Sequence, residues 1–241
     1  MSPLRHIVAA VTPDPAAGSA LRVARALADA THARLSLFSL ADHAGPGGGI
    51  VGIEIPRFAE SVQADLVVLP RILVGGELLA DAVTRRSRVP SLVVSSGQED
   101  LSTWLVALDG SPRCLTVLSM VAPLVEALRA TAVAVTVEPS HDGGGESPPG
   151  DWHLARTLKL ARALEEGLGD GSSRAGSAVL PPLRVRHGDI VTEVLNARQA
   201  LQASVLAIGS RPGGPPPPIP EGSLARHLVN DAPCMVLAVP L

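Results

Sequence analysis

Short apolar runs alternate along this chain with longer segments in which apolar residues recur every three or four positions. The short runs predict strands at His6–Val11, Leu35–Leu40, Asp65–Leu69, Ser91–Val94, Trp104–Leu108, Ala132–Val137, Leu183–Arg186, Val205–Ile208 and Met235–Val239. Strands that alternate with amphipathic helices imply right-handed crossovers and parallel sheets covered by helices. The pattern therefore predicts an α/β protein.

The helical segments complete this α/β pattern. Helices are predicted after Pro15, where Leu21, Ala24, Leu27 and Ala28 share a face, and at Ile53–Gln63, near Glu77–Arg86, around Leu115–Val125, at Trp152–Leu168 and at Val191–Leu201. Pro123 falls inside one of them and predicts a kink or a loosened turn there.

The pattern also repeats. A shift of 97 positions lays residues 5–40 over 102–137, a shift of 139 lays 49–70 over 188–209, and a shift of 143 pairs Pro90 with Pro233. We therefore predict two tandem domains, 1–97 and 98–241, related by a pseudo-two-fold axis. The change of shift leaves about 42 residues missing between Leu40 and Gly49, so the first half is predicted to be a trimmed copy. The Val191–Leu201 helix and the strand before it are expected to have no counterpart there.

Composition narrows the class of protein. Hydrophobic residues make up 46% of the chain, yet it has only two Trp, two Phe and no Tyr, so its core must consist of Ala, Val and Leu. A net charge of −3 and the scarcity of base-stacking aromatics argue against nucleic-acid binding. No uncharged apolar run reaches membrane-spanning length, which favours a soluble cytoplasmic protein rather than a membrane partner. The two cysteines, Cys114 and Cys234, indicate buried thiols. A reactive Cys114 thiol with a lowered pKa, in the first turn of a helix, is the alternative.

One stretch, Ala203–Leu241, suggests a binding site. A strand ending at Gly209 is followed by a Gly/Pro loop and by Gly222-Ser223 at the start of a helix, where backbone N–H groups can face a phosphate. In a parallel sheet ligands bind where the winding reverses, which would bring this loop beside Asp109. The structural alternative is that Asp109 and Ser111 only cap a helix. For His187-Gly188-Asp189 a strand-exit turn is favoured over a catalytic pair.

These segments resemble the universal stress protein family. WLVALDGSP, VRHGDIVTEVL, AIGS and EGSLARHLVNDAPCMVLAV carry the resemblance, mostly in the second half. It implies a flavodoxin-like, adenine-nucleotide-hydrolase-like fold that binds ATP, with or without Mg²⁺. The same resemblance implies that Asp109 contacts the adenosine and that Val137 and Ala107 lie beside the adenosine. It also implies that the phosphates are bound by Gly209, Arg211, Gly213, Gly222 and Ser223. Gly213 stands one place later than the family pattern, at which this chain has Pro212.

The first half lacks the corresponding residues. Thr12 stands in place of Asp109, Pro70 in place of Gly209, and Leu79-Ala80 in place of Gly222-Ser223, so only the second half is expected to bind nucleotide. No nucleophile motif or paired carboxylates support an enzyme. The prolines at 215–218 favour the alternative of a nucleotide-free adaptor that acts through partners or oligomerisation.

The resemblance also suggests how the halves meet. Ser91–Val94 and Met235–Val239 are predicted to pair antiparallel across the pseudo-two-fold as an intramolecular pseudo-dimer, and a homodimer is a further possibility.

Overall fold

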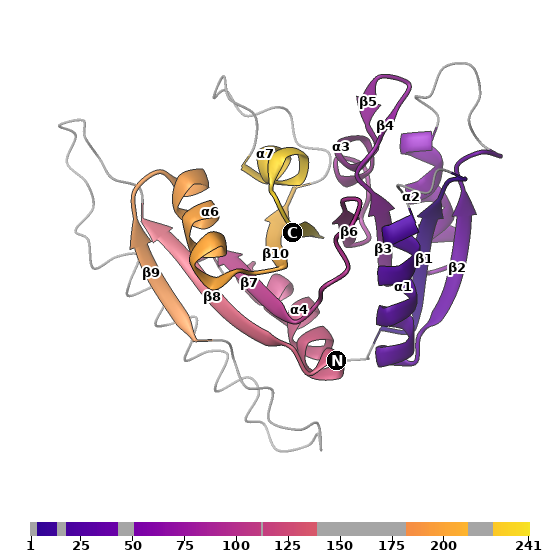
Figure 1. Ribbon diagram of the computed structural model, residues 1–241. Coiled ribbons are helices and arrows are strands. Elements are labelled where there is room, and N and C mark those ends of the chain that lie inside the picture. The colour runs from indigo at the N-terminus through magenta and orange to yellow at the C-terminus, as the bar shows by residue number, and fades with distance from the viewer. Residues whose placement is uncertain (1–3, 14–17, 43–50, 112, 139–181, 212–223) are drawn as a thin grey trace.

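A computed structural model describes residues 4–13, 18–42, 51–111, 113–138, 182–211 and 224–241 (Figure 1). The strands of the main sheet are β1 (His6–Val11), β2 (Arg34–Ser39), β3 (Leu66–Pro70), β6 (Ser91–Val94), β7 (Thr103–Leu108), β8 (Thr131–Glu138), β9 (Leu183–His187), β10 (Val205–Ser210) and β11 (Met235–Pro240). The helices are α1 (Gly18–Thr31), α2 (Val51–Ser61), α3 (Leu79–Thr84), α4 (Cys114–Leu128), α6 (Ile190–Leu201) and α7 (Leu224–Asp231). The predicted α/β class is confirmed, and the nine strands predicted from the sequence all form.

All nine strands join one sheet in the order β2-β1-β3-β6-β11-β10-β7-β8-β9. Every neighbouring pair is parallel except β6 and β11, which run antiparallel with Val93 opposite Val236 and Leu92 opposite Leu237. The predicted antiparallel pairing of Ser91–Val94 with Met235–Val239 is therefore confirmed. This pairing joins the strands of residues 1–97 to those of residues 98–241 in a single sheet.

Helices cover both faces of the sheet. On one face α1 and α4 lie side by side, and Val23, Leu27, Val121 and Leu124 belong to one apolar core that spans both halves of the chain. On the other face α2 and α3 pack over the first half, while α6 and α7 pack over the second. The side chains that fill these layers are mostly Val, Leu and Ala, as the composition predicted.

The strand registers follow the displacements found in the sequence. His6 is opposite Arg34 in β1 and β2, and residues 97 positions later, Thr103 and Thr131, are opposite in β7 and β8. Leu66 is opposite Ile7, and Val205, 139 positions after Leu66, is opposite Trp104. The same displacements therefore describe paired strands in both halves.

Left-handed backbone positions repeat in the same way. Four of the described non-glycine residues have positive φ, and they form two pairs: His32 (φ 56°) with Arg129 (φ 51°), and Gln63 (φ 53°) with Gln202 (φ 49°). The members of the first pair are 97 positions apart and those of the second 139. Each residue follows the end of a helix, where the chain turns toward the next strand.

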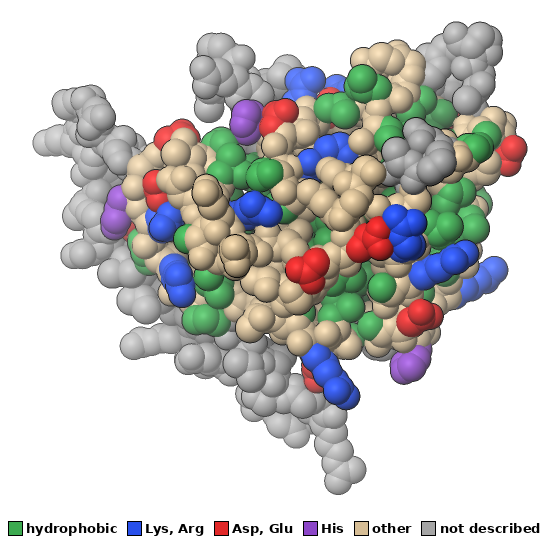
Figure 2. All heavy atoms as spheres, viewed as in Figure 1, with side chains coloured by type: hydrophobic (Ala, Val, Ile, Leu, Met, Phe, Trp, Pro, Cys, Tyr) green, Lys and Arg blue, Asp and Glu red, His purple; other side chains and the backbone are tan. Residues whose placement is uncertain are grey.

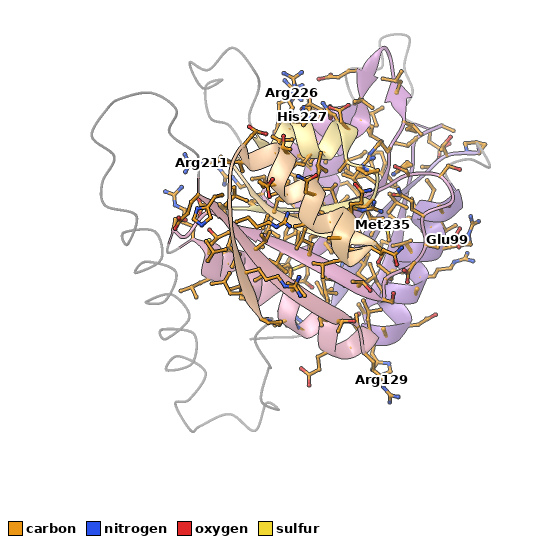
Figure 3. All side chains as sticks on the ribbon, turned by 60° about the vertical axis from the view of Figure 1, so that its left-hand side comes forward. Glu99, Arg129, Arg211, Arg226, His227 and Met235 are labelled. Carbon is orange, nitrogen blue, oxygen red and sulfur yellow. The ribbon has the colours of Figure 1, made fainter. Side chains whose placement is uncertain are left out.

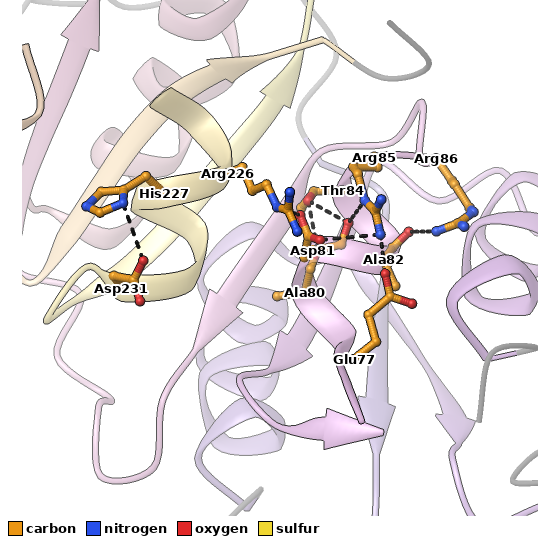
Figure 4. Close-up of polar contacts among 10 residues, drawn as sticks. All are labelled: Glu77, Ala80, Asp81, Ala82, Thr84, Arg85, Arg86, Arg226, His227 and Asp231. Atoms are coloured by element: carbon orange, nitrogen blue, oxygen red, sulfur yellow. Dashed lines mark hydrogen bonds and ion pairs between the residues drawn. The ribbon is translucent and has the colours of Figure 1, made fainter. Parts of the chain in front are cut away.

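Contacts between side chains and backbone also join the halves. The Arg71 guanidinium, beyond the end of β3, donates to the carbonyls of Ala232 and Cys234. Asp81 on α3 is 4% exposed and lies 3.3 Å from the Arg226 Nε on α7 and 3.3 Å from Arg85 (Figure 4). A buried carboxylate of the first half is thus neutralised partly by a cation of the second.

Several sequence predictions were wrong in detail. The helix predicted at Glu77–Arg86 begins only at Leu79, because Glu77–Leu78 (β5) pairs with Leu73–Val74 (β4) in a small hairpin that the sequence did not predict.

The Val191–Leu201 helix does have a counterpart in the first half, since α6 corresponds to α2 at the 139-residue displacement. Among the described strands β9 pairs with β8, whereas β2, the counterpart of β8, lies at the edge of the sheet. The helix α4 contains Pro123 and continues to Leu128, and the kink or loosened turn expected there stays a prediction. The predicted Trp152–Leu168 helix lies outside the described residues.

Candidate functional site

The winding of the second half reverses between β7 and β10, which are parallel neighbours. Asp109 follows the last residue of β7, and Arg211 follows the last residue of β10. Ala107 lies one residue before the end of β7, and Val137 lies one residue before the end of β8, the neighbour of β7. Figure 3 shows Arg211 at this end of the strands, away from Arg129 at their opposite end. The predicted neighbours Asp109 and Arg211 therefore do meet at the carboxyl edge, the place where α/β sheets bind ligands.

The Asp109 carboxylate is held through one of its two oxygens. Its Oδ1 accepts a hydrogen bond from the Ser111 backbone N–H at 2.9 Å and another from the Cys114 thiol at 3.0 Å. The first closes a local turn. The helix cap that the structural alternative predicted for Asp109 and Ser111 does not form, because the N-cap of α4 is Arg113 and no described side chain caps this helix end. Among the described residues, no group donates a hydrogen bond to Oδ2. The buried Ser111 hydroxyl also stabilises the carboxylate, but within the described part of the chain it forms no hydrogen bond of its own.

Charge at the site favours an ionised Asp109. Partial desolvation raises the pKa of its carboxyl, but hydrogen bonds from Cys114 and Ser111 and the positive charge of Arg211 more than offset this effect. The pKa of Asp109 is therefore lower than its ordinary value, and at neutral pH the carboxylate is an acceptor only.

Cys114 is not the reactive thiol that its position suggested. It begins α4 and is 3% exposed. Burial and the neighbouring Asp109 carboxylate raise its pKa to about 12, so the alternative of a lowered pKa is wrong. A thiolate beside an ionised carboxylate would be disfavoured twice over, by desolvation and by charge repulsion. The thiol is instead a hydrogen-bond donor to Asp109, a role that the sequence analysis missed.

Gly209 lies within a strand rather than at its end. β10 continues to Ser210, and Gly209 pairs with Val239 of β11, which corrects the prediction that the strand stops there. A Cβ added to Gly209 would lie 2.5 Å from the Cδ1 of Leu241. Packing against the partly buried side chain of Leu241 thus favours glycine at this position, independently of any phosphate.

His187-Gly188-Asp189 forms a turn and a helix cap. Gly188 has a φ of 142°, and Asp189 caps α6 by accepting hydrogen bonds from the Thr192 N–H at 2.8 Å and from its hydroxyl at 2.7 Å. These hydrogen bonds lower the pKa of Asp189. The imidazole of His187 lies 3.2 Å from Glu138 at the same edge. The predicted strand-exit turn is confirmed.

Three predicted phosphate contacts, Gly213, Gly222 and Ser223, lie outside the described residues. α7 begins directly after them, at Leu224. In the first half, Thr12 follows β1 and Pro70 ends β3, the counterparts of β7 and β10, while Leu79 and Ala80 are fully buried. Among the described residues that directly follow β1, none is a carboxylate, whereas Asp109 directly follows β7.

Two broader properties concern only the part of the chain that the structure describes. No group of three or more His, Cys, Asp and Glu residues there could hold a metal ion. No helix there is long and apolar enough to cross a bilayer. On the face shown in Figure 2, acidic and basic side chains are interspersed rather than segregated into one large patch.

Several solved structures share this fold. A protein from Pseudomonas aeruginosa UCBPP-PA14 assigned to the universal stress proteins has a TM-score of 0.67 at 17% identity, covering 98% of this chain and 93% of its own. A functionally unknown protein from Pseudomonas aeruginosa PAO1 has a TM-score of 0.66 at 16% identity, with coverages of 98% and 92%. A universal stress protein from Archaeoglobus fulgidus DSM 4304 has a TM-score of 0.55 at 16% identity, with coverages of 88% and 71%.

The family itself is shown by the sequence. No curated protein matches the chain. The model of the universal stress protein family matches residues 102–240, more than half of the chain and nearly all of its second half. The chain belongs to the universal stress protein family.

Proposed function

We propose that this protein is a stress-response protein that binds ATP, with or without Mg²⁺, at the carboxyl edge of β7 and β10, and that it has little or no catalytic activity. The observation that carries the proposal is the Asp109 carboxylate, whose Oδ1 is occupied by Ser111 and Cys114 while Oδ2 accepts no hydrogen bond from the described residues. A carboxylate oxygen left in this state suits a ribose hydroxyl, which needs an acceptor.

The surroundings of Asp109 fit an adenine nucleotide. Arg211 supplies a permanent cation beside the carboxylate, as a polyphosphate requires. Ala107 and Val137 are only partly buried at the same edge, so apolar surface remains for a base. Residues 213, 222 and 223 are proposed to complete the phosphate contacts on the strength of the family pattern alone.

We further propose that residues 1–97 and 98–241 are tandem domains related by a pseudo-two-fold, of which only the second binds nucleotide. The repeated registers at displacements of 97 and 139 and the antiparallel β6–β11 pairing support this arrangement. Thr12 has no carboxylate to offer a ribose, and Pro70 has no N–H to offer a phosphate.

The test separates the two oxygens of Asp109. In Asp109→Asn the side-chain carbonyl can still accept from Ser111 and Cys114, while an NH₂ donor replaces Oδ2. The variant should fold, with a loss of at most about 1 kcal/mol, because only the charge on the acceptor is removed. Its affinity for ATP, measured by isothermal titration calorimetry, should fall by about tenfold or more, since an acceptor has become a donor.

The control is Thr12→Ala, a change at the equivalent strand end of the first half, which should leave the affinity unchanged. Asp109→Ala should lose both affinity and stability. The proposal fails if the parent protein binds no ATP at about millimolar concentration, which is weak for a physiological ligand. It fails also if Asp109→Asn binds as tightly as the parent.

A further inference from the structure

The thiol of Cys114 lies beneath the proposed nucleotide site, at a position where the packing of the core does not need a polar group. Cys114 is 3% exposed and packs in the core shared by α1 and α4, where an apolar side chain of similar size would fill the same space. Its Sγ is nevertheless directed at Asp109 Oδ1, 3.0 Å away. This contact links the first turn of α4 to the end of β7.

The contact has a geometric consequence for Asp109. The Ser111 N–H and the Cys114 thiol both donate to Oδ1, from the turn and from the helix respectively. Two donors on one oxygen fix the rotation of the carboxylate and leave Oδ2 as the acceptor that remains. An acceptor held in place before the ligand arrives loses less conformational entropy on binding.

We propose that Cys114 is a positioning residue for nucleotide binding: its thiol holds Asp109 through Oδ1 so that Oδ2 is oriented to accept a ribose hydroxyl of ATP. This inference rests on the proposed function and adds a residue and a role to it. Cys114 does not contact the nucleotide and acts only through Asp109.

Two further observations agree with this role. Because burial and the Asp109 carboxylate raise the pKa of Cys114 to about 12, the thiol keeps its proton and remains a donor throughout the physiological range. In the first half, residues 97 positions earlier than Asp109 and Cys114 are Thr12 and Ala17, so the carboxylate and the thiol are missing together.

The experiment compares three variants of the full chain in ATP titrations by calorimetry. Cys114→Ala removes the donor and should weaken ATP binding by about tenfold, because orientation of a charged acceptor is lost. Cys114→Ser keeps a donor and should bind ATP within about twofold of the parent. Cys234→Ala is the matched control: it truncates the other buried thiol, which is 1% exposed and lies directly before β11, and should leave the affinity unchanged.

A second readout separates positioning from loss of packing. The pKa of the Asp109 carboxyl, followed by carbon NMR, should rise in Cys114→Ala, stay low in Cys114→Ser and not move in Cys234→Ala. Parent protein that binds ATP while Cys114→Ala binds equally well overturns this inference and leaves the proposed function intact. Parent protein that binds no ATP overturns the proposed function, and the inference with it. A loss of affinity in Cys234→Ala equal to that in Cys114→Ala overturns the inference, because packing alone would explain both.

Discussion

The two carboxylate oxygens of Asp109, at the end of β7, have different roles: one makes hydrogen bonds within the protein, and the other is proposed to bind the ligand. Oδ1 closes the turn to Ser111 and accepts from the Cys114 thiol, so Asp109 has a structural role, although not the helix cap predicted for it. Oδ2 is not needed for that role. The structural and the binding interpretations of this residue are therefore compatible, because each uses a different atom.

Gly209 offers a prediction at the same scale, because the family pattern and the packing give two different reasons for its lack of a side chain. Gly209→Ala would place its Cβ 2.5 Å from the Leu241 Cδ1. Relief requires only the partly buried Leu241 side chain to rotate, so the free energy of unfolding in urea should fall by up to about 1 kcal/mol. Leu241→Ala in the same chain should remove most of that loss, because the clashing atom is gone.

The same double variant tests the phosphate role of Gly209. If packing alone requires glycine, Gly209→Ala/Leu241→Ala should bind ATP as tightly as Leu241→Ala. If the backbone at Gly209 must approach a phosphate closely, affinity should stay low although stability has recovered. A Gly209→Ala protein as stable as the parent would contradict the packing argument.

At the scale of elements, the same backbone strain recurs at the C-terminal ends of two helices. Arg129 and Gln202 follow α4 and α6 in left-handed conformations, with φ of 51° and 49°. An L-residue adopts this conformation at a cost of about 1–2 kcal/mol, which glycine avoids.

Glycine at these helix ends should therefore stabilise the protein. Arg129→Gly and Gln202→Gly should each raise the free energy of unfolding by up to about 1 kcal/mol, since the added freedom of glycine in the unfolded chain offsets part of the gain. Gln199→Gly, on an exposed position inside α6, is the control and should lower it by about 1 kcal/mol. Thermal unfolding followed by circular dichroism measures all three, and a loss of stability in both helix-end variants would refute the strain.

How far the sequence predicts these elements depends on their length and setting. Buried strands such as β6 were located to the residue, because an apolar run bounded by turn residues has one simple interpretation. The β4–β5 hairpin was missed because two-residue strands have no periodicity, and Gly75-Gly76 between them was the remaining signal. The end of β10 was misplaced because Gly209 suggests a turn, whereas in the structure it lies within the strand and packs against Leu241, a contact that no local pattern reveals.

The candidate site, too, could be predicted from the sequence only in part. The neighbourhood of Asp109 and Arg211 followed from topology, since parallel strands bring their carboxyl ends to one edge. The Cys114 contact did not follow, because it depends on the rotamers of two side chains five residues apart. Sequence placed Cys114 in the first turn of a helix, and only the packing shows that its thiol is buried beside a carboxylate, which reverses the direction of its pKa shift.

On the scale of the whole molecule, the two halves share one sheet and one core. β6 and β11 form the antiparallel centre of the sheet, and Val93 and Leu237 are fully buried on opposite faces of it. The contacts of Arg71 with the α7–β11 connection and of Asp81 with Arg226 reinforce this junction. Loss of the β6–β11 pairing would therefore expose apolar surface of both halves, so the halves should unfold together rather than one after the other.

Whether both halves depend on the β6–β11 pairing can be tested by comparing a charge placed in the centre of the sheet with a charge placed at its edge. Val93→Asp and Leu237→Asp each place a carboxylate among apolar side chains and should cost at least about 3–5 kcal/mol, so the double variant should open or aggregate. Leu37→Asp puts the same charge on the edge strand β2, where Leu37 is 51% exposed, and should cost less than about 1 kcal/mol. If the aspartate variants do not fold, Val93→Thr replaces them in the test. It should cost about 1–3 kcal/mol, so the protein stays folded and its stability can be measured. Urea unfolding and gel filtration compare the variants. Equal losses at the centre and at the edge, or amide exchange that leaves β6 and β11 unprotected in the parent, would mean that this pairing does not hold the halves together.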